Sequence, residues 1–231
     1  MSIFTIGDLH LSFGTNKPMN IFGDNWNNFE NKIKDDWLNK VNDNDLVVLP
    51  GDFSWAMNLK DTYKDFEYIN NLPGMKILLK GNHDYWWNTV KKMRSFITDS
   101  GFNNIDFLYN NSFEFSDKII SGVRGWNLSE NIDDIRLNKR EIDRLELSIK
   151  DGIEKFGNNK EIIVFMHYPP ITKSYMHTGY IDIMKKYGVK KCFFGHLHAD
   201  SINNAVNGKI EGIDFTLVSA DSLDFKLLKI I

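Results

Sequence analysis

The chain has 231 residues, of which 42% are hydrophobic and 26% charged, the composition of a globular protein. Its net charge of −3 lacks the basic excess of a sequence-independent nucleic-acid binder, which makes nucleic acid the less favoured substrate. Cys192 is the single cysteine, so no internal disulfide can form. We find neither a signal-peptide pattern nor an apolar stretch of the ~20 residues that a membrane span needs. We therefore expect one cytoplasmic domain over residues 1–231, with no membrane association.

Strands and helices alternate through most of the chain. Phe29, Ile33, Trp37 and Val41 recur at the spacing of one helix face. Apolar runs, typical of strands buried on both faces, predict strands at 3–6, 45–49, 76–79, 161–165 and 191–194. Further helices are predicted at 60–71, 86–99, 138–156 and 175–187.

The C-terminal segment has a different pattern. We predict consecutive strands at 201–206, 213–219 and 222–230, with a hairpin turn at Asn207-Gly208. Strand–helix alternation followed by consecutive strands predicts an α/β fold, in which helices cover a mixed sheet system.

Polar residues of metal-binding type follow most of the predicted strands. Five of the six histidines lie in these segments, and only His177 lies outside. In open α/β sheets ligands bind beyond the carboxyl ends of the strands, so side chains at these ends can converge on one site. The segments are Gly7-Asp8-Leu9-His10, Pro50-Gly51-Asp52, Gly81-Asn82-His83-Asp84, Met166-His167 and Gly195-His196-Leu197-His198.

In order and spacing, these segments resemble the signature of the calcineurin-like metallophosphoesterase superfamily. The resemblance extends from residue 7 to residue 198. It implies that the α/β fold is a four-layer α-β-β-α sandwich with two mixed β-sheets. It also implies a metal-dependent phosphoric ester hydrolase, of either the phosphatase or the phosphodiesterase type.

The resemblance implies a role for each polar residue. Asp52 would bridge two metal ions, a role that suits a carboxylate because it has two oxygens. One ion would be held by Asp8, His10 and His198, and the other by Asn82, His167 and His196. Nitrogen and oxygen ligands without a thiolate favour manganese, iron or zinc, and the sequence does not choose among them.

The leading hypothesis is hydrolysis of a phosphomonoester by a hydroxide that bridges the two metals. Asp52 and His83 are the predicted catalytic residues, with His83 as proton donor to the leaving group or, alternatively, as a hydrogen-bond partner of a ligand. Asp84 would either orient His83 or cap the helix expected near residue 86. Asn82 and Arg124 are the predicted substrate-binding residues. For Arg124, between two glycines, a structural salt bridge is the alternative.

One segment departs from the classical protein serine/threonine phosphatases of the superfamily. They extend the second motif to Gly-Asp-x-x-Asp-Arg-Gly, whereas this chain reads Gly51-Asp52-Phe53-Ser54-Trp55-Ala56-Met57. The second aspartate and the arginine are absent, so the chain is more similar to small bacterial phosphohydrolases of the superfamily, whose substrates are often unassigned. We expect a small phosphorylated substrate for this chain. A phosphodiesterase or nuclease using the same site, and a non-catalytic scaffold with this fold, are the alternatives. The oligomeric state stays open.

Overall fold

Eleven strands and five α-helices form the computed structural model, which describes residues 1–231. The strands are β1 (Ile3–Thr5), β2 (Leu46–Leu49), β3 (Met75–Leu78), β4 (Ile105–Phe107), β5 (Phe113–Phe115), β6 (Lys118–Val123), β7 (Glu161–Met166), β8 (Lys191–Phe194), β9 (Gly208–Ile210), β10 (Ile213–Leu217) and β11 (Leu228–Lys229). The helices are α1 (Phe29–Lys40), α2 (Tyr63–Asn70), α3 (Val90–Asp99), α4 (Ile132–Phe156) and α5 (Gly179–Lys186). Five short 3-10 helices are η1 (Met19–Phe22), η2 (Asp24–Trp26), η3 (Leu59–Thr62), η4 (Ala199–Asn204) and η5 (Asp221–Leu223).

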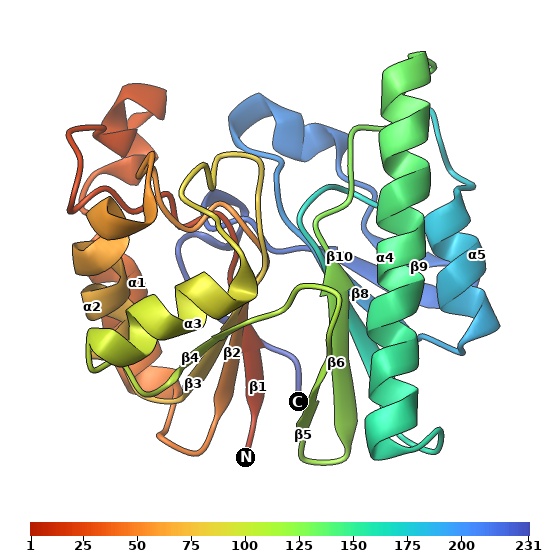
Figure 1. Cartoon of the computed structure of the whole chain (residues 1–231). Coiled ribbons are helices and arrows are strands. Elements are labelled where there is room, and N and C mark those ends of the chain that lie inside the picture. The colour runs from red at the N-terminus through yellow and green to blue at the C-terminus, as the bar shows by residue number, and fades with distance from the viewer.

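The strands form two sheets, and helices cover the outer face of each (Figure 1). The first sheet has the order β11-β1-β2-β3-β4, and the second has the order β5-β6-β7-β8-β10-β9. Neighbouring strands are parallel in the middle of both sheets, and β11, β5 and β9 pair antiparallel at the edges. Helices α1, α2 and α3 lie against the first sheet, and α4 and α5 against the second. The predicted four-layer sandwich with two mixed sheets is confirmed.

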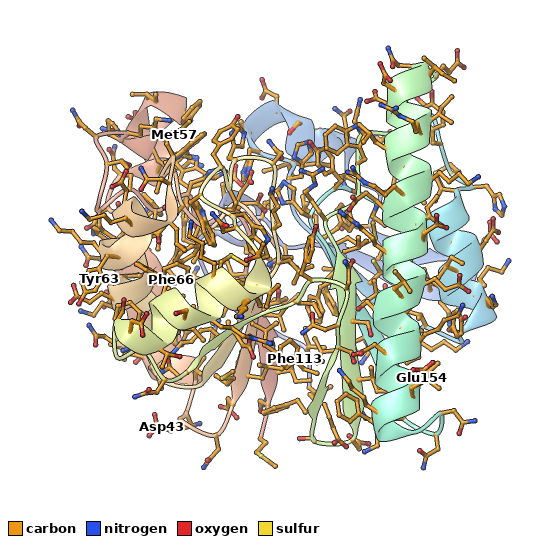
Figure 2. The ribbon with its side chains drawn as sticks, viewed as in Figure 1. Asp43, Met57, Tyr63, Phe66, Phe113 and Glu154 are labelled. Atoms are coloured by element: carbon orange, nitrogen blue, oxygen red, sulfur yellow. The ribbon has the colours of Figure 1, made fainter.

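Apolar side chains fill the three spaces between these four layers (Figure 2). Because successive residues of a strand point to opposite faces, Leu46 and Val48 of β2 lie between the sheets while Val47 and Leu49 face the helices. Both faces of the strand are therefore apolar. This is why β1, β2, β3, β7 and β8 appear in the sequence as continuous hydrophobic runs, and why these five were predicted within two residues of their bounds. The interior strand β6 was not predicted.

Several predicted helices have different bounds in the structure. Helix α4 begins at Ile132 rather than at residue 138, because Asn131 accepts a hydrogen bond from the backbone of Asp133 and caps an exposed first turn. Helix α3 begins at Val90 with Thr89 as its N-cap, not near residue 86. No helix of the structure is both long and apolar enough to cross a bilayer.

The C-terminal prediction was partly wrong. Residues 201–206, predicted as a strand, mostly belong to the 3-10 helix η4, and only Leu228–Lys229 of the last predicted strand pair in a sheet. The hairpin between β9 and β10 turns at Glu211-Gly212, where both residues have positive φ, 49° and 86°, as a type I′ turn requires. Asn207 precedes β9, and its side chain accepts a hydrogen bond from the backbone of Leu217.

Candidate metal centre

The predicted metal ligands lie together at the carboxyl ends of five parallel strands. The ends of β1, β2 and β3 come from the first sheet, and those of β7 and β8 from the second. The two sheets meet here, because Gly7 after β1 pairs with Ser219 after β10 and donates a hydrogen bond to Val218. The chain thus brings all seven predicted ligands together. The role of each residue in metal binding stays a prediction.

The first predicted ligand group is compact. Nε2 of His198 lies 3.3 Å from a carboxylate oxygen of Asp8 and 3.4 Å from Nε2 of His10. One ligand atom of each of these three residues lies within 4.8 Å of the other two. Two imidazole nitrogens and a carboxylate oxygen therefore surround one point, as a shared cation requires.

The second predicted group is centred on the side-chain oxygen of Asn82. This oxygen lies 2.6 Å from Nε2 of His167 and 2.9 Å from Nδ1 of His196. Nδ1 of His167 lies 3.2 Å from the carbonyl oxygen of Pro50, which fixes the ring and leaves Nε2 directed at the site. The amide oxygen and the two imidazoles form a second set of ligands.

Asp52 lies between the two groups. One of its carboxylate oxygens is 3.7 Å from Nε2 of His10 and 3.5 Å from Nε2 of His167, while its other oxygen accepts a hydrogen bond from the backbone of His83. This position is the one that a bridging carboxylate would need.

The charge distribution of the cluster suits cations. Burial raises the pKa of Asp52 well above its usual value, and the nearby carboxylates of Asp84 and Asp8 raise it further. Burial lowers the pKa of His167 to about 3 and that of His196 to about 4, so both imidazoles are neutral and have a free nitrogen lone pair. The carboxylate of Asp52 is unfavourable beside those of Asp84 and Asp8, and a cation bound among them would remove this repulsion. The residues fit manganese, iron or zinc.

The backbone at the site is held in an uncommon conformation. Asp8, His10, Asp52 and His196 have φ values of 58°, 46°, 49° and 75°, in the left-handed region that non-glycine residues seldom adopt. Such outliers persist only where surrounding contacts impose them, and they concentrate at functional sites. A Cβ on Gly195 would overlap the carboxylate of Asp8, so this position needs glycine.

Asp221 is a part of the site that the sequence reasoning missed. Its carboxylate lies 2.9 Å from Nδ1 of His198 and also accepts a hydrogen bond from the backbone of Ala199. Burial lowers the pKa of His198, but Asp8 and Asp221 outweigh it and raise the pKa to about 10. A carboxylate on the outer nitrogen orients a ligand histidine and increases its basicity. The available signal was an acidic residue a few positions after another strand, β10.

His83 lies next to the cluster and has no hydrogen bond from its ring to a ligand. Its backbone amide donates to Asp52 at 2.7 Å, and its half-buried ring lies 4.6 Å from the ring of Trp55, between centroids. Burial and the charge of His198 lower the pKa of His83. Nδ1 of His83 is buried without a partner. Its predicted role as a proton donor is not tested by this geometry.

Asp84 has neither of the two roles considered from the sequence. It is fully buried and accepts hydrogen bonds from the backbone amides of Gly81, Asp52 and Phe53. It therefore holds the second and third motif segments together. No contact joins it to the ring of His83, and α3 begins six residues later, at Val90.

Arg124 follows β6 at the same edge of the sheet, but its guanidinium lies beside Trp126 and lines a separate small pocket. Its guanidinium lies 4.4 Å from the ring centroid of Trp126, and it shares a small pocket with Lys80, Glu141 and Arg144. Its backbone carbonyl accepts hydrogen bonds from the amides of His167 and Tyr168. Glu141 pairs with Arg144 instead, so the alternative salt bridge does not form either. Phosphate binding by Arg124 stays a prediction.

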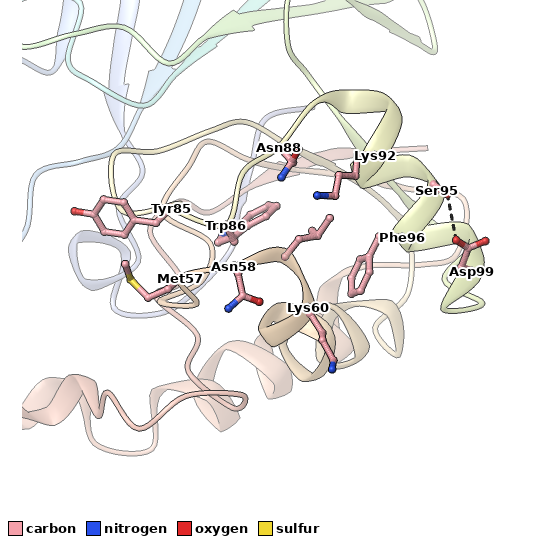
Figure 3. Close-up of a pocket in the computed structure, with 11 residues that line it drawn as sticks. Met57, Asn58, Lys60, Tyr85, Trp86, Asn88, Lys92, Ser95, Phe96 and Asp99 are labelled. Carbon is pink, nitrogen blue, oxygen red and sulfur yellow. Dashed lines mark hydrogen bonds between the residues drawn. The ribbon is translucent and has the colours of Figure 1, made fainter.

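A cavity of about 480 Å³ is separate from the histidine cluster (Figure 3). It lies between η3 and α3, where Asn58, Lys60 and Lys92 line it. No predicted metal ligand contributes to its wall. Figure 3 shows Tyr85, two residues after His83, at one end of the cavity.

Comparisons with known proteins agree with this geometry. The family model described as calcineurin-like phosphoesterase matches residues 1–200. No curated protein matches the chain. A protein of unknown function from Aquifex aeolicus, AQ665, is 18% identical with a TM-score of 0.50, and the match covers 99% of this chain and 95% of that one.

Two further solved structures share the fold at lower identity. Phosphopantetheinyl hydrolase (PptH) from Mycobacterium tuberculosis is 10% identical with a TM-score of 0.58, over 100% of this chain and 95% of that one. The protein TT1561 of Thermus thermophilus is 9% identical with a TM-score of 0.58, over 98% of this chain and 96% of that one. At these identities the structures show the fold alone.

Proposed function

Since this chain belongs to the calcineurin-like phosphoesterase family, we propose that it is a phosphomonoesterase that works with two bound transition-metal ions. The proposal depends on the position of Asp52. One of its two carboxylate oxygens lies near both Nε2 of His10, at 3.7 Å, and Nε2 of His167, at 3.5 Å. A carboxylate so placed can join two ligand groups into one centre.

The chain's own residues would divide the work. Bound metal ions lower the pKa of a water molecule and polarise phosphoryl oxygens. Asp8, His10 and His198 would hold one ion, Asn82, His167 and His196 the other, and Asp52 both. Asn82 is neutral and so limits the negative charge of the ligand set, which favours an anionic phosphate. His83, on the rim of the cluster, would give a proton to the leaving oxygen.

The test uses manganese-loaded protein with 4-nitrophenyl phosphate and with bis(4-nitrophenyl) phosphate. We expect faster turnover of the monoester. Faster turnover of the diester would contradict the proposal and favour a phosphodiesterase, and no turnover of either ester with metal bound would favour a scaffold.

The Asp52→Asn variant links this activity to the bridging carboxylate. We expect a loss in kcat of about a hundredfold or more, with weaker metal binding measured by elemental analysis. Asp43→Asn is the matched control, since Asp43 lies on the exposed turn before β2, at the opposite end of the strands (Figure 2). Unchanged activity of Asp52→Asn would rule out the bridging role.

A further inference from the structure

A cavity of about 230 Å³ opens directly beside the histidine cluster. One side of it is formed by His10, His83 and His198, which are the predicted proton donor and two predicted ligands of one metal ion. A group that leaves from phosphorus must depart toward its proton donor. The cavity that His83 lines is therefore where the alcohol part of a phosphate ester would lie.

The rest of the wall is apolar. Met19, Phe22 and Trp26 come from η1 and η2, the short helices that precede α1, and Trp55 comes from the segment after β2. The only residue of the wall not yet named is Ala199. The lining residues of this apolar wall thus include neither a carboxylate nor a cationic side chain, and a cation close to them is Lys17, whose Nζ lies 5.1 Å from the ring centroid of Trp55.

Most of this apolar wall is closely packed against neighbouring rings. Trp26 is 3% exposed and contacts the rings of Phe29 and Phe225 at centroid distances of 5.1 and 5.0 Å. Trp55 stacks on His10 with centroids 4.8 Å apart, and its indole nitrogen faces the sulfur of Met19 at 2.9 Å. A preformed apolar wall binds a flat apolar group without the cost of ordering side chains.

Phe22 differs from these residues because it is 55% exposed, at the rim of the cavity. An apolar ring that enters the cavity would remove the face of Phe22 from water. A polyhydroxylated alcohol would instead lose hydrogen bonds to water without replacing them along this wall.

We propose that this cavity binds the leaving group, and that the preferred substrates are phosphate monoesters of apolar, ring-bearing alcohols. The inference rests on the proposed function, because it needs a phosphate held at the predicted metals. Phe22 is the residue of the wall that decides how strongly an apolar alcohol is preferred.

The test compares 2-phenylethyl phosphate with ethyl phosphate, since the two alcohols have similar acidity and differ mainly in the ring. With manganese-loaded protein we expect kcat/KM to be about tenfold or more higher for the phenylethyl ester. In Phe22→Ala this ratio should fall by about threefold or more, because part of the wall is missing. Ile21→Ala is the matched control: Ile21 is 73% exposed, adjacent in sequence and not part of the wall, so its ratio should stay that of the wild type.

Binding of the non-hydrolysable 2-phenylethylphosphonate and ethylphosphonate, measured by calorimetry, gives a readout that is independent of turnover. We expect tighter binding of the phenylethyl compound, and a smaller difference in Phe22→Ala. Cleavage of both esters at equal kcat/KM, with equal phosphonate affinities, would overturn the inference and leave the phosphomonoesterase standing. If neither ester is cleaved but the ring still improves phosphonate binding, the proposed function fails and the apolar pocket stands.

Discussion

At the scale of single residues, the five histidines of the site fall into two groups. His10, His167, His196 and His198 direct ring nitrogens at oxygens or nitrogens of the other predicted ligands, at 2.6 to 3.7 Å. His83 does not: its backbone amide donates to Asp52, and its ring lies edge-on to that of His10, with the centroids 5.6 Å apart. Its ring is therefore free to face a substrate, and it is the histidine whose removal should leave the ligands in place.

We predict that His83→Ala lowers kcat by about a hundredfold, the usual contribution of a general acid, while the protein keeps its metal content. The measurements are steady-state turnover of a phosphomonoester and elemental analysis of the purified variant. His177→Ala is a suitable control, since His177 is a surface residue paired with Glu211 and Asp182. Loss of metal in His83→Ala would make His83 a ligand instead of a proton donor.

At the scale of elements, strands that form continuous apolar runs are predicted well from the sequence. Elements whose bounds are set by polar contacts are predicted less well. Strands β4, β5, β6 and β9 were missed. β4 and β5 are three residues long with a charged residue at the centre, β6 is interrupted by Ser121 and Gly122, and β9 begins at Gly208, which was predicted as a turn. Residues 201–206 were predicted as a strand although they include two asparagines, a residue type depleted in strands. The chain turns there instead, because Ala199 adopts a φ of 46° and Ser201 exchanges hydrogen bonds with the backbone of His198.

The same contrast, between local sequence patterns and polar contacts made only in the folded chain, holds for the site residues. Asp8, His10 and the other motif residues were found because they follow strands at recognisable spacings. The roles of Asp84 and Asp221 in supporting the ligands were not found, because these roles depend on which backbone amides and rings lie nearby in the folded chain. The type of a ligand residue is recognisable within one segment of the sequence, whereas the groups that orient the ligands come from several segments.

Asp65 of α2 shows such a support with a measurable pH dependence. It is buried and holds the start of the loop after β1, accepting hydrogen bonds from the Ser54 hydroxyl and the Phe13 amide. Burial raises its pKa from 3.8 to about 6, although these neutral partners lower it. A carboxyl whose pKa is raised by folding contributes its full stability below pH 3.8, and this contribution is lost as the pH rises through 6.

We therefore predict that Asp65 lowers the free energy of unfolding by about 3 kcal/mol as the pH rises from about 3 to about 7, and that Asp65→Asn removes this part of the pH dependence. Urea unfolding of both proteins at several pH values measures it, and their difference isolates Asp65 from the ligands that also titrate. Parallel pH profiles for the two proteins would show that Asp65 is charged at little cost in the fold.

At the scale of the whole molecule, the candidate centre lies across the junction of the two sheets. Asp8, Asp52 and Asn82 follow strands of the first sheet, whereas His167 and His198 follow strands of the second. Without cations, the buried carboxylate of Asp52 at this junction is electrostatically unfavourable, as its raised pKa indicates. Bound ions would hold the halves of the sandwich together, so metal binding and global stability should be coupled.

We predict that manganese raises the melting temperature and that a chelator lowers it. A metal at a hundred times its Kd stabilises the native state by about 2.7 kcal/mol. For a chain of 231 residues this corresponds to roughly 5 to 10 °C. Calorimetric melting with manganese, and after removal of metal by a chelator, measures the shift, with calcium as the control for non-specific divalent effects. Because Asp52 would contact both ions, Asp52→Asn should lose most of the shift, whereas the His83→Ala variant should retain it. Equal melting temperatures with and without manganese would mean that the two sheets are not joined through a metal centre.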